Sequence, residues 1–179
     1  MRRPQPILAP VPVKALKILF DRQPGLKHAI HRPTVLNRNY AVPYLAGLSE
    51  DGATLYIDQG APDTFQLSDG RTADYSPSLA RHEVVEWWLM THLGWDYFKA
   101  HDYAWTADSL KFTAEYGHGF DDEWQAFAEI QSIASEKQAR DLVAKFPPDL
   151  YLGPYESDID AQDQQYLSRL RAARGQSYA

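Results

Sequence analysis

The fold is decided by the stretch SPSLARHEVVEWWLMTHLG, residues 76–94, and by its continuation WDYFKAHDYAWTADSLKFTAEYG, residues 95–117. Ser76 suits the N-terminal cap of a helix, because its hydroxyl can accept a hydrogen bond from the first turn. Gly94 and Gly117 suit helix ends, because glycine tolerates the left-handed conformation of a C-terminal cap. The stretch therefore predicts two consecutive helices that fold back on each other around Gly94.

Two ionisable residues lie in the middle of the apolar stripe of the first helix. At about 100° per residue, Glu86 stands about 40° from His82 around the helix axis. Apolar residues share the same stripe: Leu79, Val85, Leu89 and Leu93. A carboxylate that is buried without a partner destabilises a fold strongly. Glu86 therefore requires a positive partner, which can be a metal cation, a Lys or Arg side chain, or a proton.

The second helix carries a similar stripe. His101, Asp108 and Glu115 recur at seven-residue spacing, which keeps them within about 40° of one another around the axis. They share this face with apolar and aromatic residues: Tyr97, Phe98, Ala104, Trp105 and Phe112. We expect Trp105 to wall a pocket on this face, and Glu115 to lie at a solvent-exposed end of the helix.

Folding the helices back around Gly94 brings the two stripes together. Glu86 lies eight residues before this glycine and His101 seven after it, so the two come level, and His82 and Asp108 become neighbours in the same way. The chain has no cysteine, so any metal must be held by His and carboxylate groups. The pattern predicts a divalent transition metal, zinc above all, bound by His82, Glu86 and His101. Asp108 is then a hydrogen-bond acceptor behind a ligand histidine, or a fourth ligand.

This motif resembles a known superfamily. The pattern HExxE over residues 82–86, followed on the next helix by Ala100-His101 and then Asp108, resembles the zincin type of metallopeptidase in reduced form. The resemblance implies a metal-dependent hydrolase, most simply a small zinc peptidase. Glu83 would be the general base that takes a proton from a metal-bound water.

The chain departs from the zincin pattern in two ways. Glu86 stands where HExxH has its second histidine, and the third ligand is His101 rather than the commoner glutamate. The resemblance further implies that a strand over residues 54–58 is the edge strand that binds an extended peptide substrate.

Other interpretations of the same residues stay open. The His, Glu and Asp side chains can form a hydrogen-bonded network without metal. They can also hold a stabilising metal in a non-catalytic protein, because the region from Pro43 to Asp58, together with the helix pair, is similar to small uncharacterised proteins of bacteria and their phages. A di-iron carboxylate site requires several Glu-x-x-His motifs. This chain has one such motif, from Glu115 to His118, and Gly117 interrupts it, so the sequence argues against a di-iron site.

Upstream of the helices the sequence predicts a small sheet. An apolar segment over residues 40–48 and a strand over 53–58 have the order of a hairpin. Residues 71–75 add a short extended piece, whereas 26–39 and 60–70 are predicted as loops.

Downstream, the sequence predicts further helices over residues 121–145 and 158–174. These elements predict an α+β fold, mainly helical, with a small N-terminal β-hairpin or sheet packed on the metal-binding helix pair. We expect one domain over residues 1–179. Its parts are an extended N-terminal arm over 1–13, the small sheet over 40–75, a three-helix core over 76–145, and a C-terminal loop and helix over 146–179.

Composition narrows the classes of partner. The 179 residues carry a formal net charge of −6, and no basic stripe offsets it, so we expect no nucleic-acid partner. No stretch approaches the roughly 18 apolar residues of a membrane span. We therefore expect a cytoplasmic protein with no membrane partner and no organic cofactor.

Overall fold

Two long antiparallel helices form the centre of the structure, a computed structural model that describes residues 11–42, 45–117, 147–157, 168 and 171–172. These helices are α3, Ser76–Leu93, and α4, Tyr97–Tyr116, and their predicted bounds are confirmed. Gly94 and Gly117 end them with φ angles of 63° and 75°, in the left-handed region.

The two helix starts differ from each other. Asp96 caps α4, since its carboxylate accepts a hydrogen bond from the backbone N–H of Lys99 at 3.0 Å. Ser76 was expected to cap α3 but lies inside its first turn. Tyr75 occupies the cap position and makes no side-chain cap bond.

Two shorter helices lie beside this pair. α1, Val13–Arg22, and α2, Pro24–Ala29, precede the sheet. The loop predicted over residues 26–39 is therefore wrong at its start. Pro24 begins α2 because its fixed φ suits the first helical position, and Leu26 anchors α2 by packing fully buried against the helix pair.

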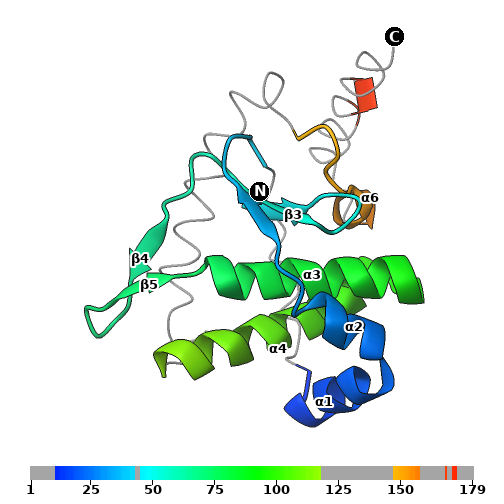
Figure 1. Cartoon of the computed structure of the whole chain (residues 1–179), viewed down its shortest axis with the longest axis horizontal. Helices are drawn as coiled ribbons and strands as arrows, with labels where there is room; N and C mark the ends of the chain where they lie inside the picture. Colours follow the sequence, from blue (N-terminus) through cyan, green and yellow to red (C-terminus); the bar gives the residue numbers. More distant parts are fainter. Residues whose placement is uncertain (1–10, 43–44, 118–146, 158–167, 169–170, 173–179) are drawn as a thin grey trace, which may run out of the picture.

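A three-stranded sheet covers one side of α3 (Figure 1). Its strands are β1, Val35–Asn37, β2, Ala46–Leu48, and β3, Thr54–Ile57, in the order β1-β3-β2. The predicted hairpin is confirmed, because β2 and β3 pair antiparallel. β1 lies within the predicted loop and pairs parallel with β3.

The sheet order overturns one expectation about substrate binding. β3 is the central strand, so both of its hydrogen-bonding edges are occupied and it is not an edge strand for a peptide. The outer edge of β2 is covered by the chain itself. Tyr151 donates its N–H to the carbonyl of Leu48 at 2.8 Å, and Glu50 donates to the carbonyl of Asp149 at 2.7 Å.

Two further short elements complete the described chain. β4, Thr64–Gln66, pairs antiparallel with β5, Thr72–Asp74. The extended piece expected near 71–75 is confirmed, but the loop expected over 60–70 contains β4. A short helix, α6, Gly153–Ser157, lies in the predicted C-terminal loop. The helix expected over 121–145 lies outside the described residues, as does most of the one expected over 158–174.

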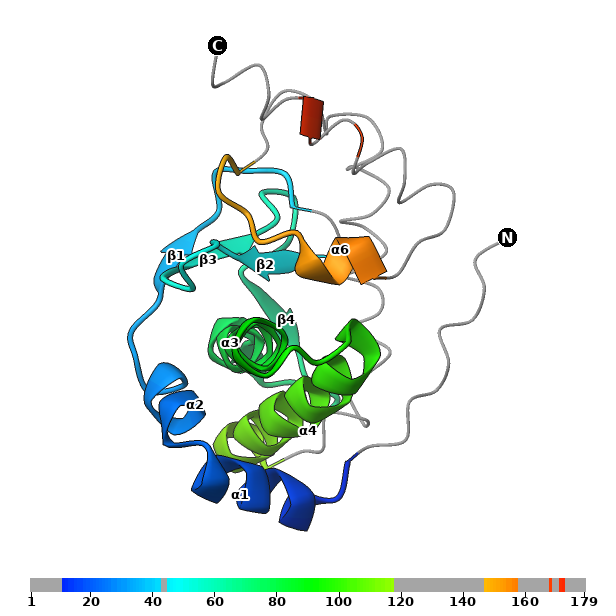
Figure 2. The ribbon, with the colours of Figure 1, turned by 90° about the vertical axis from the view of Figure 1, so that its right-hand side faces the viewer.

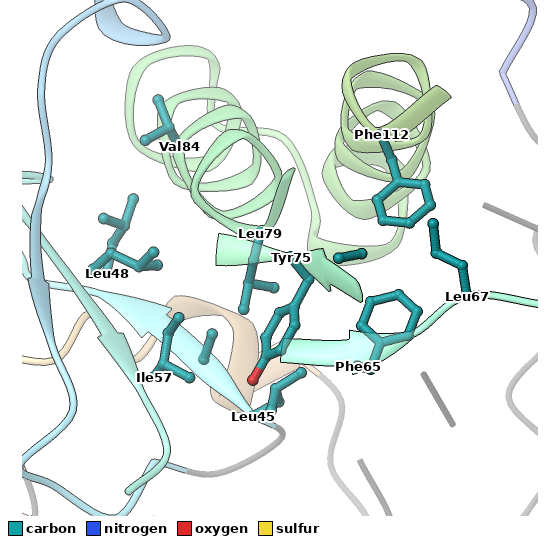
Figure 3. Close-up of a cluster of buried hydrophobic side chains, with 12 residues drawn as sticks. Leu45, Leu48, Ile57, Phe65, Leu67, Tyr75, Leu79, Val84 and Phe112 are labelled. Atoms are coloured by element: carbon teal, nitrogen blue, oxygen red, sulfur yellow. The ribbon is translucent and has the colours of Figure 1, made fainter. Parts of the chain in front are cut away.

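Figure 2 shows the strands on one side of α3 and the helices α1, α2 and α4 on the other. The core has an apolar cluster on each of these sides. One fills the space between α3 and the strands and includes Leu45, Ile57, Tyr75, Leu79 and Phe112 (Figure 3). The other joins α3 to α1, α2 and α4 through residues that include Leu16, Leu26, Val85, Leu89 and Ala104. The fold is α+β, as predicted, and it leaves the facing stripes of α3 and α4 in the interior.

Candidate metal centre

Three side chains meet between α3 and α4. His82 and Glu86 come from one turn of α3, and both are nearly fully buried, with 6% and 3% of their surface exposed. His101 comes from α4 and is more open, with 21% of its side chain exposed. One donor atom from each residue can be chosen so that all three lie within 4.8 Å of one another. This group could hold a metal ion.

The separations within the group are short and similar. His101 Nδ1 lies 2.9 Å from Glu86 Oε2 and 3.2 Å from His82 Nε2. His82 Nε2 lies 3.6 Å from Glu86 Oε2. The three atoms therefore form a nearly regular triangle, which is the arrangement that folding around Gly94 was expected to produce.

Asp108 lies behind His82, on the side away from the triangle. His82 Nδ1 donates to Asp108 Oδ2 at 2.8 Å, and Asp108 is 3% exposed. A proton held on Nδ1 leaves Nε2 as the lone-pair nitrogen facing Glu86 and His101 when the ring is neutral. Asp108 thus contacts a histidine of the group and does not itself reach the triangle.

Hydrogen bonding sets the charge of Glu86. Burial by itself would raise the pKa of this carboxyl group, but the hydrogen bond from His101 and the positive charge of nearby His82 outweigh burial and lower the pKa to about 2. Burial would likewise lower the pKa of His82, but Asp108 and Glu86 raise it well above its ordinary value. Glu86 is therefore an anion at neutral pH and is available as a ligand.

Glu83 lies at the edge of this cluster. It follows His82 on α3, keeps part of its side chain accessible, and has no hydrogen bond or ion pair within the described chain. Burial, together with the negative charge of Glu86, raises the pKa of Glu83 to about 8. Glu83 is thus a carboxyl group that exchanges protons near neutral pH.

Aromatic rings flank the open side of the group. The ring of Tyr97 lies 5.2 Å from that of His101, and the ring of Trp105 lies 6.4 Å away, centre to centre. Trp105 also packs against the cluster beneath the sheet, so it borders His101 while filling core space. The sequence pattern placed Tyr97 on the face of His101, four residues before it, but only Trp105 was expected to border the site.

Ser78 was also missed. It precedes His82 by one turn on the same stripe, is buried, and its hydroxyl has no partner in the described structure. Asp108 Oδ1 is a second buried oxygen without a partner there. The polar stripe of α3 is therefore one turn longer than the sequence pattern suggested.

Glu115 and His92 lie outside the centre. Glu115 is exposed and pairs with Lys111 at 2.8 Å, as expected for a solvated helix end. His92 is exposed and stacks on Trp88, with ring centres 4.8 Å apart. His118 is not among the described residues.

Within the described residues, no helix combines the length and the apolar composition that a membrane span requires. Comparison of the chain with protein-family models, with curated proteins and with solved structures found no match.

Proposed function

We propose that this protein binds a divalent transition metal, with zinc the best fit, through His82 Nε2, Glu86 Oε2 and His101 Nδ1, and that it hydrolyses amide or ester bonds there. The observation that carries the proposal is the spacing of these atoms. Bonds of about 2.0–2.1 Å to a tetrahedral zinc ion separate any two of its ligand atoms by about 3.3 Å. The three separations are 2.9, 3.2 and 3.6 Å.

A network without metal accounts for the same contacts less well. Without metal, His82 is protonated on both ring nitrogens and Glu86 accepts the Nδ1–H of His101 at 2.9 Å. Two N–H donors, His82 Nε2 and His101 Nδ1, would then lie 3.2 Å apart with no acceptor between them. The 3.6 Å between His82 and Glu86 is too long for a good hydrogen bond. A cation held by the three residues would contact all three donor atoms at once.

Asp108 supports this assignment because of where it sits. A ligand histidine usually donates its second ring N–H to a carboxylate or carbonyl group, which orients the ring and increases its basicity. The 2.8 Å contact from His82 Nδ1 to Asp108 has this form. The role of a positioning group follows, rather than that of a fourth ligand.

Hydrolysis requires a proton acceptor beside the ion. Bound zinc polarises a carbonyl group and lowers the pKa of water towards 7. Glu83 would accept the proton of the attacking water and transfer it to the leaving group. Glu83 adjoins His82 and has no hydrogen-bond partner in the described chain. A divalent cation beside it would lower its pKa from about 8 and so produce the carboxylate that this transfer requires.

Elemental analysis of the purified protein tests the metal. We expect about one equivalent of metal per chain. Free zinc at about 100 times the dissociation constant should raise the melting temperature of metal-stripped protein by roughly 5–10 °C. Glu86→Gln and His101→Ala should abolish both effects. His92→Ala, which removes an exposed histidine of α3, is the control and should change neither.

Two results together would contradict metal binding. Metal content below about a tenth of an equivalent, with no rise in melting temperature when zinc is added, would leave the metal-free network as the correct interpretation.

Glu83→Gln tests catalysis separately. With zinc bound, this variant should keep its metal and its melting temperature, but lose about 10²–10⁴-fold in kcat on amide or ester substrates. Glu115→Gln, an exposed carboxylate of α4, should retain wild-type kcat. A metal-loaded wild type without turnover, or a Glu83→Gln variant with unchanged turnover, would identify the ion as structural.

A further inference from the structure

The first described part of the chain has a charge opposite to the rest. Residues 13–36, which form α1, α2 and β1, contain five Lys or Arg and one Asp, a formal charge of +4. The whole chain carries −6, so the remaining residues carry −10. The five basic residues are all exposed: Lys14, Lys17, Arg22, Lys27 and Arg32. None of them forms an ion pair within the described structure.

The same segment concentrates exposed apolar side chains. Six large hydrophobic residues of the described chain are exposed, and four lie within residues 13–36. These four are each at least 41% exposed: Val13, Ile18, Val35 and Leu36. Single exposed apolar residues are ordinary. Because four of the six lie within 24 residues, among cations that form no ion pair in the described structure, this segment is the candidate for an interaction surface.

The three elements follow one another along one side of the molecule. In Figure 2 the chain passes from α1 through α2 to β1, along the side away from α6. β1 is an edge strand, since the sheet order is β1-β3-β2 and no other described strand pairs with it. Two of its side chains, Val35 and Leu36, are exposed and so open to a partner. We call the exposed residues of 13–36 the basic-apolar surface.

We propose that the basic-apolar surface binds an acidic segment of another protein, in which apolar side chains alternate with carboxylates. Charge complementarity selects an anionic partner and speeds its association. The exposed apolar residues then favour an anionic partner that also carries apolar side chains. Burying them is favourable only against apolar groups of a partner, at roughly 25 cal/mol per Å². Protein interfaces combine an apolar centre with a charged rim in this way.

Two other anionic partners fit the surface less well. A nucleic-acid backbone would pair with the cations but offers little to Val35 and Leu36, because its phosphates and sugars are polar. A membrane surface favours a helix with one broad apolar face. Only Val13 and Ile18 of the exposed apolar group lie on α1, and the other two lie on a strand.

Fluorescence anisotropy with defined probes tests the proposal on the full chain. The probe is a labelled peptide of Glu and Leu of about 20 residues, the size of one side of a standard interface. A matched peptide has Ser in place of Leu. Duplex DNA, and vesicles of phosphatidylcholine and phosphatidylserine in equal amounts, complete the set. At about 0.15 M salt, we expect the Glu/Leu peptide to bind at least about tenfold more tightly than each alternative.

Variants locate the binding surface. Lys14→Glu combined with Lys17→Glu, and separately Ile18→Ser combined with Val35→Ser, should each weaken peptide binding about tenfold or more. Lys99→Glu and Leu110→Ser are matched controls, since they change an exposed cation and an exposed leucine of α4, and they should leave binding unchanged.

Three results would overturn the proposal. One is that the Glu/Leu peptide fails to bind, or that the control variants weaken its binding as much as the variants of the basic-apolar surface do. Another is that DNA, vesicles or the Ser-containing peptide bind as tightly as the Glu/Leu peptide, because charge alone would then explain binding. The third is salt-sensitive self-association that depends on Lys14 and Lys17, because the occupant would then be a second copy of the chain. None of these results depends on the metal.

Discussion

Replacing Asp108 by Asn tests the centre with the smallest change of shape. Asn has the same size and can still accept the N–H of His82, so the helix pair should keep its packing. What changes is the charge of the acceptor in a contact of 2.8 Å between two residues that are 6% and 3% exposed. Solvent does not screen this contact. The variant therefore isolates how much a negative charge behind His82 strengthens the binding of metal in front of it.

The magnitude follows from the hydrogen bond. Bonds to charged groups contribute about 1.5–3 kcal/mol, and neutral bonds about 0.5–1.5 kcal/mol. The difference is roughly 1.4 kcal/mol, which is about tenfold in an equilibrium constant. We expect the zinc dissociation constant of Asp108→Asn, measured by competition with a chromophoric chelator, to rise about tenfold. Glu115→Gln removes an exposed carboxylate from the same helix and should leave the constant unchanged.

Two results would refute this reasoning in different directions. A change below about twofold would mean that Asp108 does not act on the metal through His82. A loss above about a thousandfold would mean that Asp108 is a ligand, contrary to its contact with Nδ1. Outer-shell partners of ligand histidines typically change metal affinity by about 10–100-fold, which lies between these limits.

Further predictions concern pH and stability. Zinc affinity should fall as pH falls below the raised pKa of His82, because the metal must displace the proton that Asp108 and Glu86 stabilise on this ring. Isothermal titration at several pH values should show proton release on zinc binding. An affinity that does not depend on pH would contradict this prediction. Gly94→Ala should lower the free energy of unfolding by about 1 kcal/mol, seen in urea denaturation, because φ is 63° and a Cβ there would meet nothing within 4 Å, so backbone strain is the whole cost. A neutral or stabilising substitution would contradict the left-handed helix end. Tyr56→Phe should lower the free energy of unfolding by about 1–2 kcal/mol in the same measurement, because it removes the hydrogen bond of 2.5 Å from the Tyr56 hydroxyl to Asp149. Tyr40→Phe is the control, since the Tyr40 hydroxyl has no such bond in the described chain. An equal loss of stability in the two variants would contradict the prediction.

The partners of the centre could be expected from the sequence because they depend on local geometry. The 3.6-residue period of α3 places His82 and Glu86 one turn apart, and the position of Gly94 sets which residues of α4 come level with them. The contacts from Glu86 to His101 and from His82 to Asp108 follow from these two features. The distances between donor atoms do not, because they depend on how closely the helices pack.

The basic-apolar surface could not be predicted from the net charge of the chain. A net charge of −6 averages a +4 segment with a −10 remainder, and sequence alone does not show which side chains stay exposed. Exposure depends on which face of α1 packs against the helix pair. Leu16 is buried, while Ile18, two residues later, is exposed.

The sequence by itself determined the helix pair, its ends and the β2–β3 hairpin, because glycine caps, helical periodicity and short turns act between residues close in the chain. Tertiary structure alone decided that β1 pairs parallel with β3 and that residues near Leu150 cover the edge of β2. Strands of three residues carry no periodic signal of their own. Their partners are chosen by burial against segments distant in the chain, and this choice removed β3 as an edge for a peptide.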